Sequence, residues 1–184
     1  MALAYNLQNG QRAERKTLIT VVEFTPVGGT TTVKELLGTR TEDSSIEYNA
    51  DIETTTDILG NNYSDMTKTQ PEQSFDPSPI VGGSPFQLWL NDKRRRNALS
   101  ELSGLTVYII TAFLIDGTPG ESNGKYACER HTDCSVTYDS IGGDTNVNMP
   151  FTIHFSNKIK TGTVDKLTSD FSFTPDPDSV NINP

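Results

Sequence analysis

The longest apolar run in the chain, VYIITAFLI from Val107 to Ile115, most constrains how the chain folds. A transmembrane helix needs about 20 consecutive apolar residues. This run has nine residues, and Thr111 is among them, so it does not span a bilayer. It is rich in β-branched residues, is apolar at odd and even positions alike, and ends at the turn sequence Asp116-Gly117. These features predict a β-strand that is buried on both faces.

Further strand signals lie on both sides of this run. They are segments rich in β-branched or aromatic residues, or segments in which apolar and polar residues alternate. They cover residues 18–24, 45–52, 125–138, 147–155 and about 162–173. In the second of them, Ile46, Tyr48, Ala50 and Ile52 form an apolar face, which predicts a half-buried strand. The Gly-Gly pairs at 28–29, 82–83 and 142–143 match no phosphate-loop pattern and predict turns.

One amphipathic helix is expected among these strands. Ser84-Pro85 places a capping hydroxyl before a proline at the first helical position. Phe86, Trp89 and Leu90 then recur at helical spacing as an apolar stripe. The cations Lys93 to Arg96 fall in the last turns, where they complement the partial negative charge of the helix C-terminus. The pattern as a whole predicts a mainly β fold with one flanking helix, in a single domain of 184 residues.

The charge balance argues against a protein that grips DNA. The chain has 15 basic and 24 acidic residues, a net charge of −9, and affinity for DNA phosphates depends on cations. Residues Lys93 to Arg96 point about 100° apart around a helix, so they do not all face one duplex. The run is better interpreted as a solvated or interface-facing helix end. The first residues lack the order of a signal peptide, so we expect a soluble protein made in the cytoplasm, with no membrane partner.

The two cysteines lie in CERHTDC, Cys128 to Cys134, with His131 between them. On a regular strand, Cys128 and Cys134 share a face about 20 Å apart, while His131 points the other way. A tetrahedral zinc site needs four convergent ligands. A zinc site and a disulfide remain as alternatives, but we expect two ordinary reduced thiols, no metal and no cofactor. No nucleophile motif accompanies His131 or His154, so we expect no catalytic residues and no enzyme activity.

The segment that suggests an identity runs from Ala50 to Leu90, ADIETTTDILGNNYSDMTKTQPEQSFDPSPIVGGSPFQLWL. A strand with DIETTTDILG is followed by a short loop, a polar strand and the helix. This order, and QSFDPSPI just before the helix above all, resembles the major tail tube proteins of long-tailed (siphovirus-type) bacteriophages. The resemblance covers about residues 15–173.

That resemblance implies a structural virion protein with a β-sandwich or barrel-like tail tube fold and one flanking α-helix. In the family, six subunits form a ring whose inner strands join into one multi-subunit β-barrel, and the rings stack into a hollow tube that delivers DNA. The implied partners are other copies of the chain, the tail terminator, tape measure and distal tail proteins, and phage DNA that passes without specific binding. The implied location is the virion tail, assembled in the host bacterial cytoplasm.

Two groups of charged residues are then expected to serve assembly. Glu47, Asp51, Glu53 and Asp57 follow each other at odd positions and are candidates for a negative lining of the bore, past which DNA slides. A solvated outer face is the alternative for this row. Arg94, Arg95 and Arg96 are candidates for contacts with acids of a neighbouring subunit.

Three segments have little to bury alone: the N-terminal arm 1–16, the loop 59–65 and the C-terminal tail 174–184. We expect at least one of them to order on assembly. Two other functions remain as alternatives, a glycan-binding β-sandwich module and a tail-completion or distal-tail ring protein of the same fold.

Overall fold

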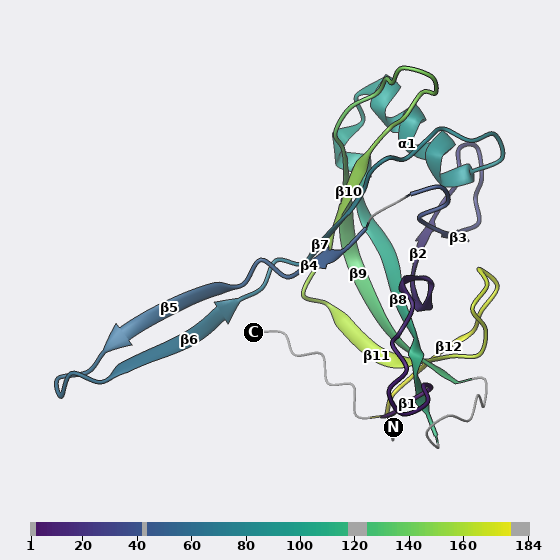
Figure 1. Cartoon of the computed structure of the whole chain (residues 1–184). Helices are drawn as coiled ribbons and strands as arrows, with labels where there is room; N and C mark the ends of the chain where they lie inside the picture. The colour runs from purple at the N-terminus through teal and green to yellow at the C-terminus, as the bar shows by residue number, and fades with distance from the viewer. Residues whose placement is uncertain (1–2, 42–43, 118–124, 178–184) are drawn as a thin grey trace.

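The computed structural model describes residues 3–41, 44–117 and 125–177. Ten strands form one antiparallel sheet, and two more form a separate hairpin (Figure 1). The strands of the sheet are β1 (Leu3–Tyr5), β2 (Leu18–Phe24), β3 (Val33–Leu36), β4 (Ile46–Glu47), β7 (Glu72–Phe75), β8 (Ser103–Asp116), β9 (Tyr126–Tyr138), β10 (Phe151–His154), β11 (Ile159–Val164) and β12 (Phe173–Pro175). The hairpin consists of β5 (Asp51–Thr56) and β6 (Asn62–Lys68). The expected mainly β fold with one flanking α-helix is confirmed within the described residues.

The sheet is built around β8 and β9, its longest strands, with the order β3-β2-β8-β9-β10-β7-β4. The prediction of a strand buried on both faces is confirmed, because Val107, Ile110 and Ile115 on β8 have no exposed surface. β1 pairs with the C-terminal end of β8, so Leu3 to Tyr5 of the expected N-terminal arm form part of the sheet. β12 pairs with β11, which likewise brings the start of the expected C-terminal tail into the sheet.

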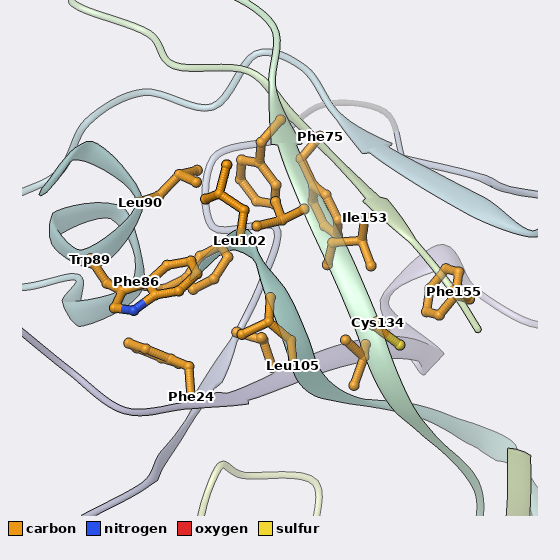
Figure 2. Packing of buried hydrophobic residues seen from close by; sticks show 14 of the residues in the cluster. Phe24, Phe75, Phe86, Trp89, Leu90, Leu102, Leu105, Cys134, Ile153 and Phe155 are labelled. Atoms are coloured by element: carbon orange, nitrogen blue, oxygen red, sulfur yellow. The ribbon is translucent and has the colours of Figure 1, made fainter. Parts of the chain in front are cut away.

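The helix α1 (Pro85–Arg96) covers one face of the sheet and begins as the sequence predicts. The Ser84 hydroxyl accepts a hydrogen bond from the Gln87 backbone N–H, and proline occupies the first helical position. Phe86, Trp89 and Leu90 are buried, and Figure 2 shows them pointing toward the strands. The Phe86 ring packs edge-on against Phe24 at a centroid distance of 5.3 Å. These contacts place α1, followed by the 3₁₀ helix η2 (Leu99–Leu102), on the main hydrophobic core.

The two cysteines lie on opposite faces of the sheet, in contrast to the expectation that they share one. Cys134 opposes Leu105 in the core beneath α1, whereas Cys128 opposes Ile110 in a second cluster on the other face. The pairing shifts register between these points, and Asp133 has a left-handed φ of 59°, the signature of a β-bulge. The extra residue reverses the alternation, so His131 shares the face of Cys134.

The expected strand over residues 45–52 is interrupted. β4 ends at Glu47, and Asn49 has a φ of 39°, a left-handed conformation that asparagine adopts more readily than most residues. The Asn49 side-chain amide donates to Gln70 O at 3.3 Å, which fixes the bend. Only Ile46 of the predicted apolar face packs on the core, while Tyr48 and Ile52 are 57% and 60% exposed. The half-buried face predicted for this strand was therefore wrong.

Three further boundaries differ from expectation. Residues 62–65 of the expected loop 59–65 belong to β6. The strand expected over 147–155 begins only at Phe151, because Pro150 lacks the N–H that a ladder requires. The strand expected over 162–173 is a hairpin, since β11 ends at Val164 and the chain returns as β12.

Candidate assembly surfaces

The β5–β6 hairpin extends away from the body of the protein (Figure 1). Every residue of its two strands is exposed. Cross-strand side-chain hydrogen bonds join Thr54 to Ser64 at 3.3 Å and Thr56 to Asn62 at 2.7 Å. An isolated two-stranded hairpin is only marginally stable in water, and neither face of this one is covered by another element. The hairpin is therefore a segment whose ordering benefits from a surface outside its own chain.

Acidic residues dominate the hairpin and include one unfavourable pair. Four acids and one lysine, Lys68, leave its two strands and turn with a net charge of −3. Asp51 opposes Lys68 across the strands, which balances one of the acids. Glu53 opposes Asp65 directly, and like charges at opposed positions repel. Neither of these two carboxylates forms an ion pair with any described residue.

The tip of the hairpin combines an ordered turn with bare apolar side chains. The Asp57 carboxylate accepts hydrogen bonds from the Asn61 side chain, the Leu59 and Asn61 backbone N–H groups and the Tyr63 hydroxyl. These bonds, led by that from the Asn61 side chain, lower the pKa of Asp57 from 3.8 to about 2. The turn presents Ile58 and Leu59 to solvent, 102% and 81% exposed. The end of the projecting arm therefore carries two apolar side chains that its own chain does not cover.

The four candidate lining acids do not form one continuous row. Glu47 lies on β4 in the sheet, where it opposes Glu72. Asp51 and Glu53 lie on β5, beyond the bend at Asn49, and Asp57 organises the tip turn. The alternation of odd and even positions assumed one regular strand, but the left-handed conformation of Asn49 separates the sheet from the hairpin.

The three candidate arginines lie at the end of α1, as expected, and Arg96 already pairs with acids of its own chain. Arg96 donates to Asp92 at 2.7 Å and lies 3.6 Å from Glu101, which Lys93 also contacts. These cations lower the pKa of Asp92 and Glu101, mainly through hydrogen bonds from Arg96 and Lys93 respectively.

The other two arginines have less to bind within the chain. Arg94 donates to the side-chain oxygen of Asn91 at 2.9 Å. Arg95 is exposed, and no described acid lies within ion-pair distance of it. Arg95 is therefore the cation of this run that is most accessible to a carboxylate of another molecule.

A residue that sequence reasoning missed holds the other end of α1. Glu35, on β3, accepts a hydrogen bond from the Ser84 hydroxyl at 2.6 Å and another from the Phe86 backbone N–H at 2.7 Å. A carboxylate at this position satisfies free N–H groups and complements the helix dipole. Because Glu35 is 49 residues from Ser84 in the sequence, no local sequence pattern predicts this contact.

The described residues contain no group of three or more His, Cys, Asp or Glu side chains that are placed to hold a metal ion. Burial raises the pKa of the Cys128 thiol to about 12 and that of Cys134 to about 11, which makes both poor nucleophiles and poor metal ligands. Across the same residues, α1 is too short and too polar to cross a membrane.

No family model and no curated protein matches the sequence, whereas several solved structures are similar to the chain. Among solved structures, the chain is similar to the sheath/tube terminator of an extracellular contractile injection system, PVC, in the extended state, with a TM-score of 0.48, 10% identity and coverage of 84% of this chain and 99% of that one. It is also similar to a chain of the PVC sheath-tube complex in the extended state, with a TM-score of 0.46 and 13% identity. That match covers 84% of this chain and 94% of the other.

A third similar structure is the tube-terminating cap of the anti-feeding prophage, with a TM-score of 0.47, 11% identity and coverage of 85% and 95%. At such identities and scores, these likenesses say nothing about what this chain binds.

Proposed function

We propose that the chain is a structural subunit that assembles with copies of itself into hexameric rings, which stack into the hollow tail tube of a bacteriophage and let DNA pass. The order of segments from Ala50 to Leu90 supports this, because it resembles tail tube proteins of long-tailed phages. The terminator, tape measure and distal tail proteins are its proposed partners, and the virion tail, assembled in the host cytoplasm, is its proposed location.

The observation that carries the proposal is the projecting β5–β6 hairpin. Its two strands are exposed throughout and its tip carries the bare side chains of Ile58 and Leu59. The arm buries no side chains within its own chain, whereas contact with a neighbouring subunit would bury them. The sheet also ends at β3 and β4, and strand edges of this kind pair when copies close into a ring.

The proposed lining of the bore divides between the sheet and the hairpin. Glu47 lies on β4 at one end of the sheet, where copies would join into the barrel in this proposal, while Asp51, Glu53 and Asp57 lie on the arm. We therefore place Glu47 in the lining first and expect Glu47→Gln to leave tubes intact but to weaken their repulsion of DNA. Retention of DNA by purified tubes at low salt measures this, and unchanged retention would remove Glu47 from the lining.

Electron microscopy of the purified protein over a range of concentrations tests the proposed function. Long tubes with a central channel are the expected result, and analytical ultracentrifugation gives the mass of the smallest ring. Discrete single rings at all concentrations would favour a tail-completion or distal-tail protein instead. A monomer at every concentration would refute self-assembly.

A glycan-binding module is the less supported alternative. Trp89 is not available to stack a sugar, because it is 5% exposed and packs against Phe24 and Phe86. No other tryptophan exists in the chain.

A further inference from the structure

We infer that the β5–β6 hairpin of one copy docks on α1 of a second copy, with its apolar tip against Leu88 and with Glu53 and Asp65 around Arg95. This inference rests on the proposed self-assembly and names the two surfaces that meet. The hairpin surface consists of Glu53, Ile58, Leu59 and Asp65, and the helix surface consists of Leu88 and Arg95.

The hairpin surface needs a cation that its own chain does not supply. Glu53 and Asp65 are opposed across the strands, where like charges destabilise the pair. Lys68, the only cation of the hairpin, opposes Asp51 instead. An arginine placed between Glu53 and Asp65 converts their repulsion into two attractions, because its planar guanidinium donates to carboxylates in a fork.

The helix surface offers such a cation on the same side as an exposed apolar side chain. Leu88 is 62% exposed, although the buried stripe of α1 lies on the core. Arg95 is seven residues after Leu88, which places both on the same side of α1 about 10 Å apart along its axis. With four cations and two acids, residues 84–102 carry a net charge of +2, opposite to the −3 of the hairpin.

The two surfaces also match in the order and spacing of their apolar and charged side chains. Along the hairpin, the apolar tip at Ile58 lies at most about 16 Å from Glu53, because β5 ends at Thr56 and the turn shortens the distance. Along the helix, Leu88 precedes Arg95 by about 10 Å, and the flexible side chains of Glu53 and Arg95 bridge the difference. An apolar contact at one end and a charge contact at the other fix both the position and the direction of docking.

Disulfide trapping between two singly substituted proteins tests the contact. We expect Leu59→Cys mixed with Leu88→Cys to form a disulfide between positions 59 and 88 under mild oxidation, identified by mass spectrometry of the joined peptides. Because the two substitutions are on different molecules, this bond forms only between copies. The native Cys128 and Cys134 do not compete, since both are buried and their pKa values are raised to about 12 and about 11.

Ile159→Cys is the matched control, because Ile159 on β11 is 37% exposed and β11 lies away from α1 (Figure 1). Mixed with Leu59→Cys, it should give at most a small fraction of the disulfide seen with Leu88→Cys. Equal yields for the two mixtures would show random collision and overturn the inference.

Charge exchange provides a second, independent test. We expect Arg95→Glu and Glu53→Arg each to weaken self-association by about tenfold, the scale of about 1.4 kcal/mol for one charge contact, and the double variant to restore much of it. Sedimentation measures the association, and circular dichroism checks that each variant is folded. Tubes that form normally in both single variants, without the disulfide between positions 59 and 88, would overturn this contact and leave the proposed function standing. Absence of any assembly in the unmodified protein would overturn both.

Discussion

Replacing Glu35 with alanine should destabilise the protein by removing the carboxylate that holds the start of α1. The Ser84 hydroxyl and the Phe86 N–H donate to this carboxylate at 2.6 and 2.7 Å. Hydrogen bonds to a charged group contribute about 1.5–3 kcal/mol each to stability. At a half-buried site, water molecules hydrogen-bond to the freed donors in the variant and recover part of this free energy. We expect a loss of about 3 kcal/mol, which corresponds to a fall of about 6–12 °C in Tm for a chain of this length.

Chemical denaturation followed by circular dichroism measures the free energy of unfolding of this variant. Glu35→Gln should lose about half as much, because the amide keeps one oxygen that accepts a hydrogen bond. Glu14→Ala is the matched control, since Glu14 is an exposed acid whose partner is Lys16, and it should change stability by less than about 0.5 kcal/mol. If Glu35→Ala unfolds at the same denaturant concentration as Glu14→Ala, the carboxylate does not hold the helix and the reasoning fails.

Three other predictions concern the core, the thiols and the hairpin turn. Phe86→Ala should cost about 3–5 kcal/mol in unfolding free energy because it empties a site that is 1% exposed, and a loss below about 1 kcal/mol in denaturant titration would contradict this. Cys128 and Cys134 should react with a thiol reagent at pH 8 only after unfolding, given their raised pKa values, so rapid reaction of the native protein would refute their burial. The pKa of Asp57, lowered from 3.8 to about 2, means that its stabilisation of the turn is present above about pH 4 and is lost as pH falls through about 2. An NMR titration of the Asp57 carboxyl group that centres near its ordinary value would contradict the turn geometry.

The elements that local chemistry specifies were predictable. β2 runs over Leu18–Phe24, as its β-branched residues indicate, and β8 contains the whole apolar run from Val107 to Ile115. α1 begins after Ser84 because a hydroxyl cap and a proline act within one turn of the chain. In each case the signal lies in neighbouring residues, and long-range contacts do not change it.

The candidate site was predictable only in part. The acids near the hairpin and the arginines at the end of α1 are visible in the sequence, but their arrangement is not. The left-handed conformation of Asn49 separates Glu47 from the acids of β5, and the bulge at Asp133 moves Cys128 and Cys134 to opposite faces. A single residue outside the regular strand conformation inverts every later side chain, and alternation patterns do not reveal it.

The sequence by itself therefore determined a mainly β chain with one capped amphipathic helix, an acidic charge balance and the resemblance to tail tube proteins. Tertiary structure alone decided that residues 51–68 leave the sheet as an exposed hairpin, because that depends on whether a second surface covers them. It also decided that Glu35 caps α1 and that Glu53 opposes Asp65. These contacts join segments by strand register and packing, which are properties of the whole sheet, so no local stretch of sequence encodes them.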